Sequence, residues 1–163
     1  MANYKLLMDD DLNEDFSLLA IHCSEESFKM AYLLNKYAGL RLKRRRVDLD
    51  FSANGLDVTF PCFEFEDLLQ YTNYTLVGNK CKSVTAHTHS SGGLFGADAS
   101  ESTVITYLLP EYKNVDFFLK IDSDFASVPL RKLSGSINEI KQVISAYTLE
   151  ASDIKSKNNL IFD

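Results

Sequence analysis

A basic block at residues 41–46 is the densest group of charged side chains in the sequence. Its cationic members make up five of the 17 Lys and Arg residues of the chain: Arg41, Lys43, Arg44, Arg45 and Arg46. Guanidinium and ammonium groups at this density suit a phosphorylated ligand, an RNA or an acidic protein such as a carrier protein. The alternative is a solvated sheet edge, where the cations pair with Asp48 and Asp50 and prevent edge-to-edge aggregation.

Two closely spaced histidines, His87 and His89, are the candidates for metal ligands. A His-x-His pair on a strand can place two imidazoles on the same side of a metal ion. No third ligand follows at a suitable spacing, so no metal is assigned. Ser90 and Ser91 come next, but the Gly-x-Ser-x-Gly turn that exposes a nucleophilic serine is absent.

The carboxylates of Glu111, Asp116, Asp122 and Asp124 lie close together in the sequence, and acid-base chemistry would use groups of this kind. No partner base or set of metal ligands accompanies them. The glycine-rich loops of nucleotide-binding enzymes and the His-Glu-x-x-His signature are also missing. We therefore predict no catalytic residue and no cofactor, and an enzyme is the third of three functional hypotheses.

The composition predicts a single folded domain over residues 1–163. Hydrophobic residues make up 45% of the chain, and there are only 7 glycines and 3 prolines. These values exclude a collagen-like or a wholly disordered protein. The formal net charge of -6 disfavours non-specific binding to nucleic acid.

The N-terminal residues and the cysteines predict a cytoplasmic protein. The first residues are acidic where a secretory signal needs a basic and then an apolar region, and no stretch approaches about 18 apolar residues. The three cysteines, Cys23, Cys62 and Cys81, are an odd number without a Cys-x-x-Cys pair. We expect reduced, mostly buried thiols and no contact with a membrane.

The first third of the chain predicts a strand followed by a helix. Residues 16–23 are an apolar run, and Ser24 is placed to cap a helix over about 25–38 that Gly39 ends. The apolar residues at helical spacing are Phe28, Ala31, Tyr32, Leu34 and Tyr37. We expect this stripe to face the core.

The middle of the chain predicts hairpins. Apolar positions change phase within residues 43–46, and Asn54-Gly55 marks a tight turn between two strands. A strand over about 57–66, in which Pro61 marks an edge or a phase change, should pair with residues 70–79. Residues 80–102 are rich in Ser, Thr, Gly and Ala, and we expect a long mobile loop there.

The last third predicts strand, turn, strand, helix and strand. The strands cover 102–109, 115–122 and 143–150, and a helix over about 128–142 has Ser127 as its cap. Its apolar stripe continues into the next strand: Leu130, Leu133, Ile137, Ile140 and Ile144. Alternation also puts Val115 on one side of its strand with Phe117, Leu119 and Ile121.

Together these elements predict an α+β fold. We expect an antiparallel or mixed sheet of about seven strands with both helices on one face. Two strand-helix-strand units, 16–49 and 115–150, flank the hairpins. They are similar to those of ferredoxin-like regulatory domains, and this analogy is the basis of the second functional hypothesis, a small-ligand-binding domain.

The turn at residues 109–117 has the sequence Leu109-Pro110-Glu111-Tyr112-Lys113-Asn114-Val115-Asp116-Phe117. Pro110 cannot donate to a strand ladder and should start the turn, while Glu111 and Asp116 can accept hydrogen bonds from loop amides. The segment is interpreted as a structural turn or as a contact surface.

This turn resembles the signature of the IPExxxVDY family of Bacteroidetes-type bacterial proteins. Pro110, Glu111, Val115 and Asp116 match at the right spacing, whereas Leu109 and Phe117 replace Ile and Tyr. The similarity extends over nearly the whole chain, including the opening strand and helix, Leu94-Phe95, residues 118–122 and the tail at 154–162. The family has no assigned activity, and its genes are associated with fatty-acid synthesis and pyruvate kinase genes. The resemblance implies a bacterial, cytoplasmic lineage.

The first functional hypothesis is a non-enzymatic protein-interaction or regulatory domain. Its contact surfaces would be the basic block and the turn at 109–117. The expected partner is an acidic or phosphorylated protein, and a homodimer is also left open.

Overall fold

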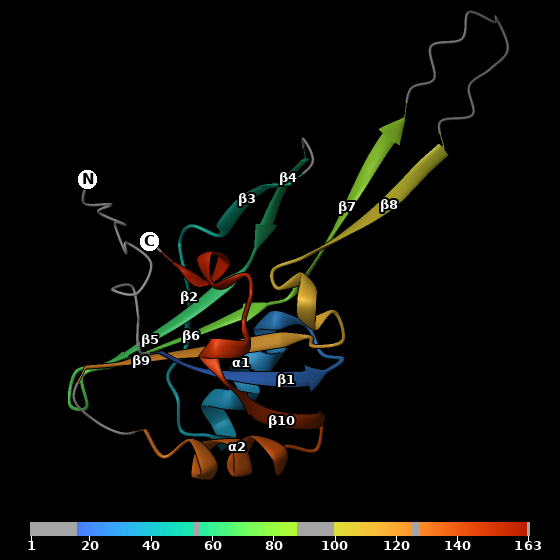
Figure 1. The fold of residues 1–163 in the computed structure, drawn as a ribbon. Coiled ribbons are helices and arrows are strands. Elements are labelled where there is room, and N and C mark those ends of the chain that lie inside the picture. Colours follow the sequence, from blue (N-terminus) through green and yellow to red (C-terminus); the bar gives the residue numbers. More distant parts are fainter. Residues whose placement is uncertain (1–15, 54–55, 88–99, 125–127, 163) are drawn as a thin grey trace, which may run out of the picture.

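The computed structural model describes residues 16–53, 56–87, 100–124 and 128–162, and these form the predicted α+β fold (Figure 1). The helices are α1 (Ser27–Tyr37) and α2 (Leu130–Asn138). Three short 3-10 helices are η1 (Pro110–Tyr112), η2 (Ala151–Asp153) and η3 (Lys157–Leu160). The strands are β1 (Phe16–Cys23), β2 (Lys43–Arg44), β3 (Leu49–Ala53), β4 (Leu56–Phe60), β5 (Cys62–Asp67), β6 (Thr72–Gly78), β7 (Lys80–His87), β8 (Ser100–Tyr107), β9 (Phe117–Ser123) and β10 (Val143–Leu149).

Six strands form the central sheet, in the order β10-β1-β9-β6-β5-β2. All neighbouring strands in it are antiparallel. Two further pairs, β3-β4 and β7-β8, are separate antiparallel ribbons. The alternative of a mixed sheet is therefore wrong, and some strands predicted for one sheet belong to these ribbons.

The four strands β10-β1-β9-β6 have the split β-α-β arrangement of a ferredoxin-like fold. Because each neighbour pair is antiparallel, β1 is parallel to β6 and β9 is parallel to β10. The connection from β1 to β6 crosses β9, and the connection from β9 to β10 crosses β1. The predicted first unit, 16–49, is incomplete: β2 contains only two residues at the far edge, and the strand that completes the crossover from β1 and α1 is β6.

A hydrophobic core lies against each face of the central sheet. Leu119 and Ile121 of β9 lie in one core with the apolar residues of α1 and α2, so both helices cover one face as predicted. Phe118 points to the other face, where the β3-β4 ribbon and the C-terminal 3-10 helices supply the second core. Val115 belongs to this second core rather than to the face of Phe117, because it precedes the first residue of β9.

Helix α1 buries only part of the predicted stripe, because Ala31 and Leu34 are buried as expected but the three aromatic residues are not. The exposed fractions of Phe28, Tyr32 and Tyr37 are 61%, 54% and 52%, and the buried residues are Met30, Ala31, Leu33 and Leu34. The helix therefore has two apolar stripes, and the aliphatic one packs against the sheet. The exposed rings of Tyr32 and Tyr37 instead contact the ammonium groups of lysines on the same helix.

Both helices are shorter than predicted. Helix α1 begins at Ser27 with Glu26 at its N-cap position, so Ser24 does not cap it. Helix α2 ends at Asn138 rather than near residue 142. Residue 127, the predicted cap of α2, lies outside the described residues.

The predicted loop at 80–102 is mostly strand in its described parts. Residues 80–87 and 100–107 pair in register from Lys80 with Tyr107 to His87 with Ser100. Figure 1 shows this ribbon extending away from the central sheet. Alternating Val, Thr and Ser form a strand once a partner strand is present, although their short side chains give little hydrophobic signal. Residues 88–99, including Leu94 and Phe95, lie outside the described part.

The hairpins agree with the sequence pattern. The β3-β4 register pairs Ala53 with Leu56, which leaves residues 54–55 as the connection. Pro61 separates β4 from β5, where the chain passes from the ribbon into the central sheet. Strand β5 pairs with β6 as expected.

Candidate functional site

Asn79, at the junction of β6 and β7, organises the turn at residues 109–117. Its side chain is fully buried. The Nδ2 amide donates to the carbonyl oxygens of Tyr112 (2.8 Å) and Val115 (2.9 Å), and Oδ1 accepts from the backbone N–H of Leu109 (2.9 Å). One side chain therefore holds three points of the turn.

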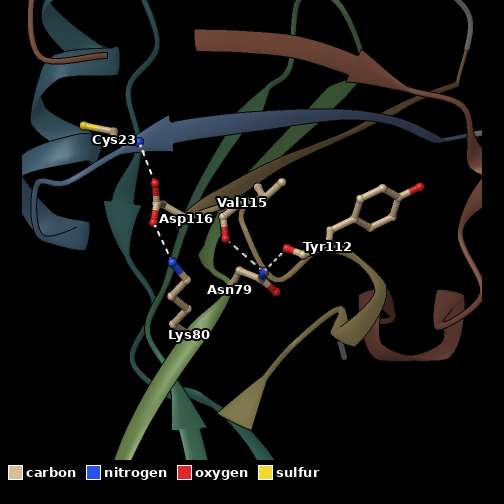
Figure 2. A network of polar contacts seen from close by, with 6 residues as sticks. All are labelled: Cys23, Asn79, Lys80, Tyr112, Val115 and Asp116. Atoms are coloured by element: carbon tan, nitrogen blue, oxygen red, sulfur yellow. Dashed lines mark hydrogen bonds and ion pairs between the residues drawn. The ribbon is translucent and has the colours of Figure 1, made fainter. Parts of the chain in front are cut away.

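Asp116 connects this turn to two strands (Figure 2). Its Oδ2 accepts a hydrogen bond from the backbone N–H of Cys23 at 2.9 Å, and its Oδ1 lies 3.0 Å from the Nζ of Lys80. The backbone of Asp116 also bonds to Asn79 and Ile21. The carboxylate is thus occupied by contacts within the fold.

Glu111 attaches the C-terminal segment to the turn. Its Oε1 accepts hydrogen bonds from the backbone N–H groups of Lys155 (2.9 Å) and Ser156 (2.8 Å), and its Oε2 accepts one from the Ser156 hydroxyl (2.9 Å). Partial burial alone would raise the pKa of Glu111, but the hydrogen bonds from Ser156 and Lys155 outweigh it and lower the pKa.

The remaining residues of the turn divide between core and surface. Leu109, Val115 and Phe117 are buried, whereas Pro110 is exposed at the start of η1. The two acidic residues that a contact surface would use, Glu111 and Asp116, instead accept hydrogen bonds from the protein itself. The geometry therefore gives the turn a role in joining segments.

The basic block lies on edge strand β2 and the connection to β3. Arg41, Lys43, Arg44 and Arg46 are exposed, and a shallow hollow of about 500 Å³ extends over residues 43–47 and Glu64. Arg44 forms an ion pair with Asp48 (2.6 Å), and Arg45 forms one with Glu64 (2.8 Å). Asp48 thus pairs with a cation of the block, as the solvated-edge alternative predicts. In the described part of the chain, no ion pair neutralises Arg41, Lys43 or Arg46.

A second, polar hollow of about 280 Å³ lies on the sheet face opposite the helices. Its lining residues come mainly from three strands, the basic block and the C-terminal segment: Arg45, Glu64, Phe65, Glu66, Asn73, Tyr74, Thr75, Lys120, Asp122 and Phe162. The register places Glu64, Thr75 and Lys120 in one row across the sheet. Arg45 and Glu64 line both hollows, so the two regions are adjacent.

Lys120 is the most unusual residue of the polar hollow, because only 6% of it is exposed. Its Nζ lies 3.3 Å from Oδ1 of Asp122. The same ammonium faces two aromatic rings, with the centroids of Phe16 and Phe162 at 5.2 Å and 5.4 Å. A buried ammonium needs such partners to offset its loss of hydration.

The predicted carboxylate cluster does not converge on one site. Glu111 and Asp116 precede β9, whereas Asp122 lies near the C-terminal end of this strand. With the rise per residue of an extended strand, Asp116 and Asp122 are about 20 Å apart. Only Asp122 lines the polar hollow.

The metal candidates give no site within the described residues. No group of three or more His, Cys, Asp and Glu side chains there could hold a metal ion. His87 is the last residue of β7, and His89 lies outside the described part. None of the described helices is long and apolar enough to cross a membrane.

The cysteines are free thiols, as expected from their number. Cys23 and Cys62 are buried, and Cys81 is partly exposed. Burial raises the pKa of the Cys62 thiol to about 11, which keeps it protonated at neutral pH. The nearby guanidinium of Arg45 lowers this pKa by less than burial raises it.

Three important polar residues escaped the sequence patterns: Asn79, Lys120 and Asn138. Asn79 sits between two strands, where a turn residue is ordinary, and Lys120 occupies a polar position in an alternating strand. A signal for Lys120 did exist, since it follows Phe118 on the same side of β9 and that face is buried.

Comparison with protein-family models, with curated proteins and with solved structures finds no match for this chain.

Proposed function

We propose that the protein is a non-enzymatic interaction domain that binds an acidic or phosphorylated protein through its basic surface. The basic surface is formed by the exposed side chains of Arg41, Lys43, Arg44 and Arg46. Its uncompensated cations are the observation that carries the proposal, because the chain as a whole has a net charge of -6. The proposal includes a bacterial cytoplasmic location and membership of the IPExxxVDY family, both supported by the turn at 109–117.

The charge distribution favours an acidic protein with a localised contact. An acidic partner is repelled by most of the surface and attracted at the basic surface, which fixes where it docks. Exposed Val47, 66% accessible, lies within this region and adds apolar contact area. A long nucleic acid would also meet the acidic surroundings, which disfavours RNA as the partner.

The test is fluorescence anisotropy with a labelled Asp/Glu-rich peptide, its phosphoserine counterpart and a single-stranded RNA. We expect both peptides to bind with an affinity that falls as salt rises. Reversing three cations, Arg41→Glu, Lys43→Glu and Arg46→Glu together, should weaken peptide binding by about tenfold or more.

A matched control reverses three exposed cations elsewhere, namely Arg131→Glu, Lys141→Glu and Lys157→Glu. This variant has the same net charge as the first, so an equal loss of binding would show that only total charge matters and would refute the proposal. Tighter binding of the RNA than of either peptide would also contradict it. Circular dichroism of both variants checks that they fold.

A further inference from the structure

We propose that the polar hollow beside Lys120 binds a small zwitterion, with a free α-amino acid as its simplest form. The hollow adjoins the basic surface, but none of the four cations that define that surface lines it, so binding there does not depend on the proposed interaction with a protein. It rests on the burial of Lys120, on the mixture of charges in the lining and on the size of the hollow.

The ammonium group of Lys120 has room for a further hydrogen-bond acceptor. An ammonium group has three N–H donors. Within the described residues its ion-pair partner is Asp122, at 3.3 Å, and the ammonium also lies over the rings of Phe16 and Phe162. Aromatic faces attract a cation but do not accept a strong hydrogen bond as a carboxylate does. A ligand carboxylate in the hollow would supply that acceptor.

The charges that line the hollow are mixed, which disfavours both a simple anion and a simple cation as the ligand. Three carboxylates, those of Glu64, Glu66 and Asp122, share the lining with the cations of Arg45 and Lys120. Arg45 is paired with Glu64, and Lys120 with Asp122. A lone anion would approach all three carboxylates, and a lone cation would approach Lys120. A zwitterion satisfies both signs.

Glu66 is the carboxylate best placed to bind the positive group of the ligand. In the described part of the chain no ion pair involves Glu66, which is exposed beside the hollow on β5. The sheet register puts Glu66, Asn73 and Asp122 in one row, next to the row that contains Lys120. The ligand ammonium therefore lies near Glu66 and the Asn73 amide oxygen, while its carboxylate lies near Lys120.

The volume limits the ligand to a small metabolite. At about 280 Å³, the hollow is at the lower end of the range for small-molecule sites, which is too small for a dinucleotide. The ring of Phe162 at its edge provides apolar contact for the carbon part of the ligand.

The experiment is isothermal titration calorimetry of the full chain against the free proteinogenic amino acids. For each amino acid that binds, the decarboxylated amine and the deaminated acid are titrated as well. We expect at least one amino acid to bind and both of its analogues to bind about tenfold more weakly or not at all. Binding by none, or equal binding of the deaminated acid, would overturn the inference.

Two variants test the assignment of residues. Lys120→Met keeps an unbranched apolar side chain next to the rings of Phe16 and Phe162. Glu66→Gln changes an exposed side chain, so this variant should fold normally. Each should weaken amino-acid binding by about tenfold, whereas Lys141→Met, on the surface away from the hollow, should not. Wild-type affinity in Glu66→Gln would refute the placement of the ammonium even if Lys120→Met failed to fold.

Discussion

Asn79 shows how one buried amide can hold several segments of this chain together. Both of its amide donors and its carbonyl oxygen bond to backbone groups of the turn at 109–115, and its own backbone bonds to Leu108 and Asp116. Its side chain has no exposure that would allow water to replace these bonds. At the scale of the residue, the structural importance of the turn comes from such buried acceptors and donors.

We predict that Asn79→Ala lowers the free energy of unfolding by about 3 kcal/mol, because it leaves buried carbonyl and N–H groups without partners. Asn79→Asp should cost more at neutral pH, since a carboxylate would face the carbonyl oxygens of Tyr112 and Val115. Urea denaturation measures both. The control is Asn73→Ala, an exposed position on β6, for which we expect a change of about 0.5 kcal/mol or less. Equal effects at the two positions would contradict the role of Asn79.

Glu111 should make stability depend on pH in the acid range. Its pKa in the folded protein is lowered, so its contribution is complete above its ordinary pKa of 4.5 and is lost as the pH falls through the lower, folded-state value. At neutral pH, Glu111→Gln should be about 1 kcal/mol less stable than the wild type. The difference should shrink as the pH is lowered below 4.5, as measured by urea denaturation at a series of pH values. A difference that stayed constant with pH would contradict this linkage.

At the scale of the element, an asparagine from each helix binds both backbone groups of one residue at or beside an edge strand of the central sheet. Asn138, at the end of α2, donates to the backbone oxygen of Ala146 (2.8 Å) and accepts from its N–H (2.7 Å). Asn35 of α1 makes the same pair of bonds with Leu42, just before β2 (3.0 Å and 2.8 Å). Unpaired backbone groups on an edge strand promote aggregation, and the Asn138 amide occupies two of them on β10.

We predict that Asn138→Ala and Asn35→Ala each lower the free energy of unfolding by about 2 kcal/mol. Asn138→Ala should also increase self-association, because it uncovers the backbone of β10 beside the exposed side chain of Ile144. Thermal unfolding and sedimentation velocity measure the two effects. Asn114→Ala, at an exposed turn position, is the control for loss of an amide. A monomeric and fully stable Asn138→Ala would refute the capping role.

At the scale of the whole molecule, the sheet brings two distinct regions side by side. The basic surface lies on the edge of β2, and the polar hollow lies on the adjacent outer face, with Arg45 and Glu64 lining both. The β3-β4 ribbon and the C-terminal segment pack on the outer face, and the hollow exposes polar side chains of that face such as Glu64 and Glu66. The two proposed sites can be tested independently, since the charge-reversal variant of the basic surface retains Arg45.

Local patterns were sufficient for many of the elements. Alternation in residues 117–122 predicted both faces of β9, and Asn54-Gly55 and Pro61 located the hairpin and the change of sheet. Local patterns failed in two places. In α1 both an aromatic and an aliphatic stripe were available, and in residues 80–87 the apolar residues Cys81, Val84 and Ala86 do not share one alternating face.

The candidate sites were harder to predict from the sequence than the helices and strands. The basic block was found because its cations are adjacent in the chain, and its exposure follows from the cost of burying charge. The polar hollow was not found, because Glu66, Asn73 and Lys120 come from three strands and become neighbours only through the sheet register.

The sequence by itself determined the α+β class, the positions of most strands and the charge of the basic block, since these depend on the period and the composition of short segments. The tertiary structure decided the strand order, the face that α1 buries, and the partners of Asn79, Glu111 and Lys120. These are pairings between residues far apart in the chain. Their free energy depends on which groups share a buried space, and no local period carries that information.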